Sequence, residues 1–127
     1  MKKLILVLFL LSTASIAFAD SVNLLYDPTI QLTDAEPTVT RYVQCNKVQD
    51  VYVWVESDKG LSIVITPVLD SQQNILGPPS SAEVIAPGGG SALAAYSYIG
   101  STKAMVVVTK NEAGSTSTFN LYVTGRY

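Results

Sequence analysis

Carboxylates, aromatic rings and a single thiol are the side chains of this 127-residue chain that could carry chemistry, because the sequence contains no histidine. Without histidine the commonest general base and the commonest metal ligand are missing, and neither a Ser-His nor a Cys-His pair can form. One cysteine without histidine also excludes ordinary structural zinc sites. A pair of carboxylates, which suffices for glycoside hydrolysis, is the catalytic chemistry that remains.

The carboxylates do not form an obvious catalytic pair. They lie mostly in predicted turns or at strand ends, where solvated carboxylates normally sit: Asp27, Asp34, Glu36, Asp50, Glu56, Asp58, Asp70, Glu83 and Glu112. Asp34 with Glu36 could offer oxygen ligands to calcium, but no EF-hand pattern accompanies them. The glycine run 87–91 lacks the spacing and the lysine of a phosphate-binding loop. We therefore predict a protein that is not an enzyme and has no cofactor or metal.

The aromatic residues are the most informative candidates for binding. They fall at the polar parity of their predicted strands, opposite the aliphatic faces: Tyr42, Tyr52, Trp54 and Tyr122, with Tyr96 and Tyr98 if their segment is a strand. Flat rings with polar tips suit both protein interfaces and stacking on sugar faces. The alternative interpretation is cross-strand aromatic pairing on a solvated face or beneath the loops 77–81 and 87–90.

Residues 51–69 predict the most regular structure in the chain. Val51, Val53 and Val55 share one parity and Tyr52 and Trp54 the other, which is typical of a strand with one buried face. The turn 57–60 and the apolar run after it predict a β-hairpin. In the preceding strand, 37–47, Arg41 falls on the apolar parity, which indicates a strand end, an edge or a bulge.

The rest of the chain predicts further short strands separated by turns. Asp27 and Pro28 indicate a turn, and residues 29–35 are either a weak strand or an extended arm. Residues 91–99 favour a strand over a helix, with Leu93, Ala95 and Ile99 inward, and 111–115 predict a hairpin loop. The fold class is therefore all-β, an antiparallel sandwich of Ig-like or jelly-roll type with about seven to nine short strands.

The first residues predict export. Lys2 and Lys3, the apolar run 4–11 and the Ala17-Phe18-Ala19 site have the order of a bacterial-type cleaved signal peptide. The apolar run is shorter than the roughly 18–20 residues that span a bilayer. Cleavage after Ala19 would leave one domain, 20–127, in which 20–36 could be an N-terminal arm, and no membrane span. We expect a periplasmic or secreted protein.

Charge limits the partners. After removal of residues 1–19, six basic and ten acidic side chains remain, a net charge of −4. The basic residues are scattered singly, so nucleic acid is excluded as a partner. The leading hypothesis is a structural or interaction protein of the cell envelope or extracellular matrix that self-associates or binds another protein. The alternatives are a carbohydrate-binding module using the aromatic face and a small secreted inhibitor.

Cys45 is the single cysteine, so an intramolecular disulfide cannot form. Cys45 has the parity of Val39 and Val43, the apolar side of its strand, which favours a buried thiol over an intermolecular bridge or a redox site.

We predict that Cys45 resists thiol reagents in the native protein and reacts only after denaturant is added. The measurement is the rate of thiol labelling with and without denaturant. Rapid labelling of the folded protein would contradict burial.

Overall fold

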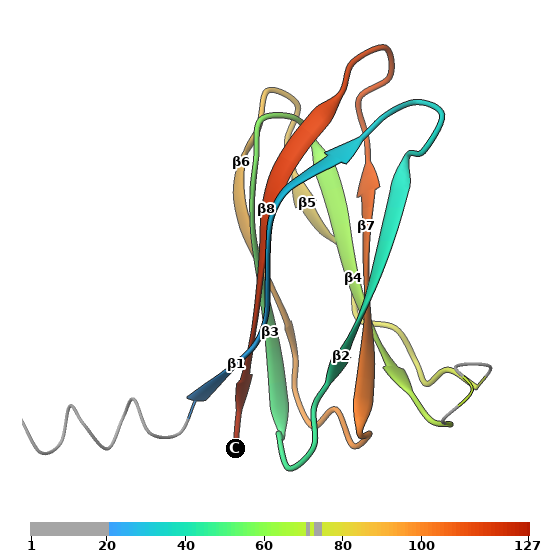
Figure 1. The fold of residues 1–127 in the computed structure, drawn as a ribbon, viewed down its shortest axis with the longest axis vertical. Coiled ribbons are helices and arrows are strands. Elements are labelled where there is room, and N and C mark those ends of the chain that lie inside the picture. Colours follow the sequence, from blue (N-terminus) through green and yellow to red (C-terminus); the bar gives the residue numbers. More distant parts are fainter. Residues whose placement is uncertain (1–20, 71, 73–74) are drawn as a thin grey trace, which may run out of the picture.

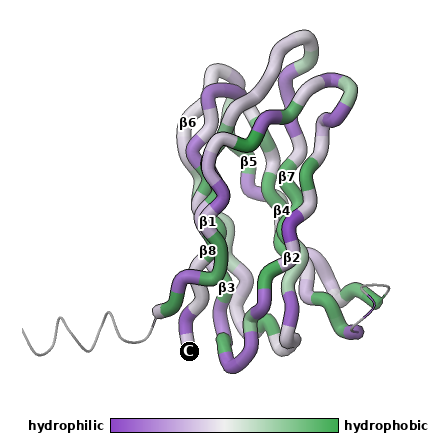
Figure 2. The backbone as a smooth tube through the Cα atoms, in the orientation of Figure 1, coloured by the Kyte–Doolittle hydropathy of each residue, from purple (hydrophilic) through white to green (hydrophobic). Residues whose placement is uncertain are grey.

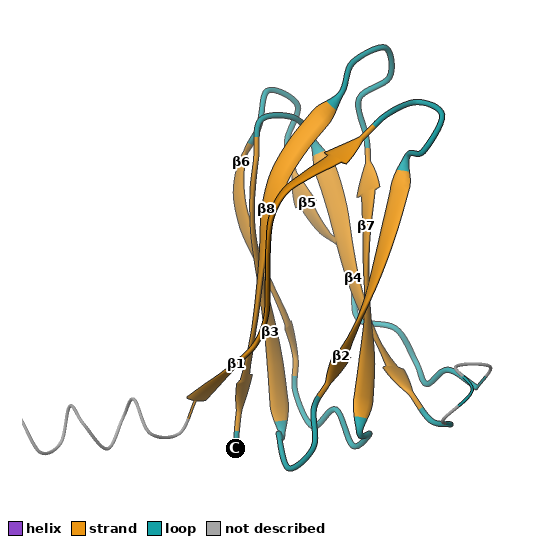
Figure 3. Ribbon diagram, viewed as in Figure 1, coloured by secondary structure: helices purple, strands orange, loops and turns teal. Residues whose placement is uncertain are grey.

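The computed structural model describes residues 21–70, 72 and 75–127; the predicted signal peptide lies outside the described residues. Eight strands of this part form two antiparallel four-stranded sheets that pack face to face (Figures 1 and 3). Sheet A has the order β1-β8-β3-β6 and sheet B the order β2-β7-β4-β5. The strands are β1 (Ser21–Leu32), β2 (Thr38–Gln44), β3 (Asp50–Ser57), β4 (Leu61–Val68), β5 (Glu83–Ile85), β6 (Gly90–Tyr96), β7 (Lys103–Lys110) and β8 (Ser117–Arg126). The predicted all-β sandwich is confirmed.

The strand pairs are nested. β1 pairs with β8, β2 with β7, β3 with β6 and β4 with β5, as in a long antiparallel ribbon folded over on itself. The ladders β3–β8 and β4–β7 then complete the two sheets. This is the jelly-roll arrangement, one of the two types that the sequence left open.

Two predicted hairpins are wrong. β3 and β4, expected to pair across residues 57–60, belong to different sheets, and so do β7 and β8 on either side of 111–115. The turn at 57–60 carries the chain across the sandwich, because a nested ribbon places most consecutive strands in opposite sheets. The turn expected at Asp27-Pro28 is also wrong, since both residues lie inside β1, where the register with β8 shifts.

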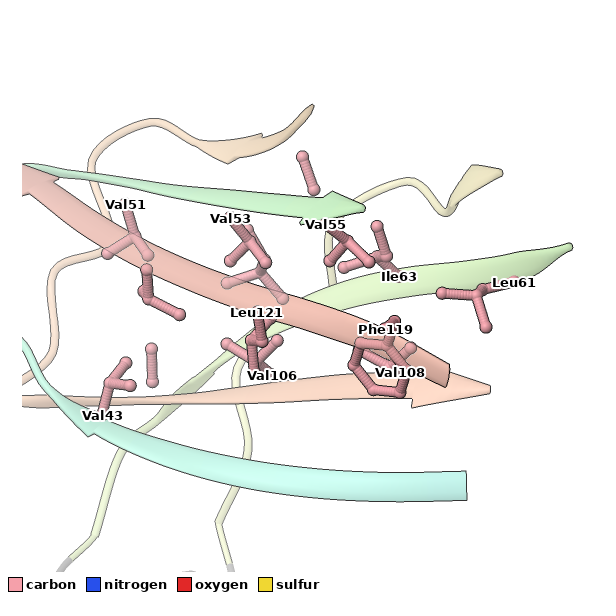
Figure 4. Close-up of a cluster of buried hydrophobic side chains, with 14 of the residues drawn as sticks. Val43, Val51, Val53, Val55, Leu61, Ile63, Val106, Val108, Phe119 and Leu121 are labelled. Carbon is pink, nitrogen blue, oxygen red and sulfur yellow. The ribbon is translucent and has the colours of Figure 1, made fainter. Parts of the chain in front are cut away.

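The core fills the space between the sheets. Val51, Val53 and Val55 of β3 are fully buried, as predicted, and so are Leu121 and Val123 of β8. Figure 4 shows the β3 valines and Leu121 meeting Ile63, Val106 and Val108 from sheet B, with Phe119 and Leu61 toward one end. Figure 2 shows the corresponding alternation of hydrophobic and hydrophilic residues along the strands. Period-two alternation therefore sets which face of each strand is buried.

The phase predicted for residues 91–99 is partly wrong. The segment is a strand through Tyr96, but Ala94 faces the core at 1% exposure while Leu93 is 51% exposed. Tyr96 packs partly against the core instead of pointing outward, and Ile99 is buried beyond the end of the strand. Alanines occupy both sets of alternating positions in this strand, so the sequence does not show which set faces the core.

Polar contacts close the sandwich at two places. Arg41 lies on β2, an edge strand of sheet B, and its Nε donates to Asp27 Oδ2 of β1 at 2.7 Å, which links the two sheets. At one end the buried Lys110 ammonium donates to Asp34 Oδ1 at 2.5 Å and to the Glu112 carbonyl. This hydrogen bond to Lys110 is the main cause that lowers the pKa of the Asp34 carboxyl. The Asp34 carboxylate is therefore the charged partner of the buried Lys110 ammonium group.

Gly88 and Gly89 provide a matched test of the turn that leads into β6. Both have a left-handed backbone, with φ of 95° and 91°. A Cβ on Gly88 would meet nothing within 4 Å, whereas a Cβ on Gly89 would lie 2.5 Å from the Ser57 carbonyl oxygen. Gly89 is therefore required both for its φ and for the close approach of two turns.

We predict that Gly88→Ala lowers the free energy of unfolding by about 1–2 kcal/mol, the cost of a left-handed alanine. Gly89→Ala should lose at least about 2 kcal/mol more, because its Cβ collides with backbone that cannot move cheaply. Urea unfolding of both variants measures the difference. Equal losses would show that the close approach contributes nothing.

Candidate functional site: the outer face of sheet A

Three aromatic side chains from three strands line up across the outer face of sheet A. In the ladder register Tyr26 of β1 is opposite Tyr122 of β8, and Tyr122 is opposite Trp54 of β3. We call Tyr26, Tyr122 and Trp54 the aromatic row. Leu93 of β6 is opposite Trp54 and extends the row to the last strand of the sheet.

The alternation of the core strands directs these side chains outward. Val53 and Val55 on either side of Trp54, and Leu121 and Val123 on either side of Tyr122, are fully buried, so the intervening rings must face away from the core. Tyr26 is 59% exposed and Trp54 38% exposed, while Tyr122 between them is half-buried. The row is therefore a surface feature with a partly covered centre.

The rings are held by one another and by a polar contact. Tyr26 and Tyr122 stack with ring centroids 4.9 Å apart and an interplanar angle of 29°. The Trp54 indole N–H donates to Glu56 Oε1 at 3.2 Å. An offset stack of this kind restrains both rings.

Polar side chains flank the row on both sides. The next outward positions toward one end of the sheet are Asn23, Thr124 and Tyr52, and those toward the other end are Asn120 and Glu56. Asn120 also fixes the bulge in β1: its Oδ1 accepts the Thr29 amide N–H at 2.9 Å, where Thr29 has a φ of 59°. The outer face thus combines a line of rings with hydrogen-bonding groups on either side.

The irregularity of β1 creates a hollow beside the row. The register with β8 shifts between Asn23 and Leu25, and a hollow of about 330 Å³ lies there. Its lining is mostly apolar and comprises Asn23, Leu25, Tyr26, Tyr122, Val123 and Thr124. A second hollow, of about 350 Å³, lies at the opposite edge, where the segment Pro79–Ser81 and Glu83 face Ala95, Tyr96 and Ser97.

The structure gathers only part of the predicted aromatic set. Tyr52, Trp54 and Tyr122 share the outer face of sheet A, but Tyr42 lies on β2 of sheet B and points away from the opposite side of the sandwich. Tyr96 is half-buried, and its hydroxyl donates to the Pro78 carbonyl at 2.8 Å. Tyr98 lies beyond β6 at 75% exposure, and its amide donates to Asp50 Oδ1. These three tyrosines are not part of the row.

Sequence reasoning missed Tyr26 and Leu93. Tyr26 follows Leu24 and Leu25, two adjacent apolar residues at a register shift, so no parity could be assigned to it. For Leu93, the parity that it shares with Ala95 and Ile99 predicts an inward side chain, and the structure contradicts this prediction. Tyr26 could have been identified from its position opposite Tyr122, but that position follows only when β1 is known to pair with β8.

Cys45 and Glu112 lie outside the aromatic row, and each makes a hydrogen bond within the protein. Cys45 is 1% exposed; burial raises the pKa of its thiol, which donates to the Ser101 carbonyl. Glu112, at the same end as Lys110, accepts the Gly60 amide N–H, and this hydrogen bond lowers the pKa of its carboxyl. In the part of the chain that the structure describes, no three carboxylate or thiol groups gather as a metal site requires. That part also contains no helix long and apolar enough to cross a membrane.

Comparison with known proteins identifies the fold. The sequence matches no protein-family model and no curated protein. The PBSX exported protein XepA superposes with a TM-score of 0.59 at 16% identity, over 84% of this chain and 36% of that chain. The pre-peptidase C-terminal domain of a collagenase from Bacillus anthracis gives 0.52 at 14% identity, over 79% and 88%. A mitogen from Yersinia pseudotuberculosis gives 0.52 at 14%, over 79% and 85%. These likenesses show a shared β-sandwich fold.

The titration of Tyr122 tests the geometry of the row. Burial is the main cause that raises the pKa of Tyr122 above its ordinary value of 10.0, followed by its hydrogen bond with Tyr26. Because the folded state prefers the neutral phenol, the stability that Tyr122 contributes is present below pH 10 and is lost as the pH rises through its raised pKa.

We predict that Tyr26→Phe moves the pKa of Tyr122 back toward its ordinary value, whereas Tyr42→Phe, on the opposite face, leaves it unchanged. The phenolate absorbance of each variant, minus that of the same variant carrying Tyr122→Phe, measures this pKa. A Tyr122 that titrates normally in the wild-type protein would contradict the stacked arrangement.

Proposed function

We propose that the protein is an exported, non-catalytic binding module that holds a polysaccharide chain along the aromatic row. The observation that carries the proposal is the register Tyr26–Tyr122–Trp54, which aligns three rings across neighbouring strands. A pyranose ring presents C–H groups on its faces and hydroxyls around its rim, so it stacks on an aromatic ring while its rim meets polar groups. The face of sheet A offers both.

The dimensions of the row suit an extended chain. Strands lie about 4.8 Å apart, so the distance from β1 to β6 is about 14 Å. Along this line Tyr26, Trp54 and Leu93 are exposed. Asn23, Thr124 and Asn120 lie beside it, where they can bond sugar hydroxyls. A polymer lying across the strands would therefore meet rings beneath it along its length and polar side chains on both sides.

The narrowness of the row favours a polysaccharide over a protein partner. A stable protein interface buries about 800 Å² on each partner around a continuous apolar centre. Here the apolar strip is one side chain wide, and polar residues border it on both sides. The exposed rings therefore suit a thin ligand.

The carboxylates near the row support a binding role without catalysis. Glycoside hydrolysis needs two carboxyl groups free to face one bond. Glu56 Oε1 accepts the Trp54 indole N–H, and Asp58, in the turn that follows β3, accepts the Thr118 amide N–H at 2.8 Å. Both groups are already engaged in holding the surface.

Binding is tested with the fluorescence of Trp54, the single tryptophan of the chain. We expect one of the soluble glucan, xylan, mannan or chitin oligosaccharides to change its emission in a saturable titration. Tyr26→Ala should weaken that binding about tenfold or more, because a ring that anchors a ligand contributes about 1.4 kcal/mol or more. The matched control is Tyr42→Ala, an exposed tyrosine on the opposite face at 42% exposure, which should bind as the wild type does.

Affinity electrophoresis in gels containing each polysaccharide extends the test to Trp54→Ala, which lacks the tryptophan fluorescence that the titration measures. Loss of retardation in this variant and in Tyr26→Ala, with retention in Tyr42→Ala, would support the row. The absence of any saturable change with all four oligosaccharides, or equal losses in Tyr26→Ala and Tyr42→Ala, would overturn the proposal.

A further inference from the structure

The two sheets have four edges, and three of them are protected against pairing with another strand. β1 contains Pro28 and two register shifts, β2 carries Arg41 in its ion pair with Asp27, and β5 is only three residues long. Proline, bulges, charges and shortness are the devices by which edge strands avoid association. These edges are unsuited to strand addition.

β6 is the exception. It has seven residues, Gly90–Tyr96, in an unbroken register with β3, and it contains neither a proline nor a charge. In the part of the chain that the structure describes, β3 is the only strand with which β6 pairs. Its other edge therefore presents backbone N–H and C=O groups to solvent. At one end of this edge a hollow separates Ala95, Tyr96 and Ser97 from Pro79–Ser81 and Glu83 of the same chain.

We propose that β6 pairs with β6 of a second copy of this chain, antiparallel and centred on Leu93. A two-fold axis through the middle of the strand places Leu93 opposite Leu93 of the second copy. The same axis places Tyr96 opposite Gly90, Ala95 opposite Ser91 and Ala94 opposite Ala92. The largest side chain of the strand thus meets the residue without one, and no like charges meet.

The exposure of Leu93 supports this occupant. Leu93 is 51% exposed at the centre of an uncharged strand, and its neighbours on the same face, Ser91 and Ala95, are small. In the pair the two leucines would cover each other at the one point where the strand carries a large apolar side chain outward. A self-complementary patch of this kind is what a two-fold interface requires.

The pairing would join the two aromatic rows end to end. Leu93 is opposite Trp54 within one copy, so two-fold pairing makes one continuous sheet with a single line of outward side chains through both copies. If the row binds a polymer, the dimer offers two sites on one line, and the second binding event becomes intramolecular. The pairing itself does not depend on what the row binds.

Association is expected to be weak, because one short strand pair buries less surface than a standard interface. Sedimentation equilibrium of the purified protein, at concentrations from about 1 µM to 1 mM, should therefore show a monomer–dimer equilibrium with a micromolar or weaker dissociation constant. Leu93→Lys places two ammonium groups opposite each other and should weaken the dimer about tenfold or more. Val84→Lys, at an exposed position on the other sheet, is the matched control and should leave the dimer intact.

A cysteine variant tests the register itself. Directly opposed residues of an antiparallel pair have Cα atoms about 4.5–5.5 Å apart, within disulfide range. Leu93→Cys should therefore form a covalent dimer under mild oxidation, whereas Val84→Cys should not, and the buried Cys45 provides the same background in both. A strict monomer at all concentrations would overturn the proposal. So would a dimer that persists in Leu93→Lys, or equal cross-linking of the two cysteine variants.

Discussion

The insertion of β8 between β1 and β3 is the contact on which the rest of sheet A depends. This last strand pairs with the first strand on one edge and with the third on the other. Its inward residues Phe119, Leu121 and Val123 are buried in the core, and its outward residue Tyr122 is the centre of the aromatic row. A shift of β8 by one residue would exchange these two sets, since successive side chains face opposite sides. The register of β8 therefore determines both which residues fill the core and which residues form the aromatic row.

Because the pairs are nested, most of the stabilising contacts join residues far apart in the chain. The ladder between β1 and β8 joins Ser21 to Arg126, and sheet A has no central strand until residues 117–126 are in place. Loop closure must precede such contacts, so folding is expected to be slow relative to proteins rich in local pairs. Once the ribbon has folded over, the Arg41–Asp27 pair links the two sheets, and the Lys110–Asp34 contact ties β7 to the loop between β1 and β2.

Alternation in the sequence predicted the buried faces of β3 and β8 correctly but could not identify strand partners. The valines of β3 and the apolar residues of β8 follow a strict period of two, which is local information. The turn at 57–60 has hairpin residues, yet a Cβ on Gly60 would lie 3.1 Å from the Ile85 carbonyl oxygen, so the glycine serves a close approach to another turn. At β6 the alanines conceal the phase, and at β1 the register shift conceals the parity of Tyr26. The aromatic row could thus be predicted only in part, because its members are aligned by pairing between distant strands.

The same irregularities that protect one edge of sheet A also make the two ends of the row different. At the β1 end the register shifts discourage a further strand and open the hollow beside Tyr26 and Tyr122. At the β6 end the strand stays regular and uncharged, so the sheet can continue beyond Leu93. The aromatic row therefore has two unlike ends: register shifts oppose strand addition at β1, and a regular strand permits it at β6. In the proposed pair the aromatic row is therefore lengthened through β6, and the β1 hollows lie at its two outer ends.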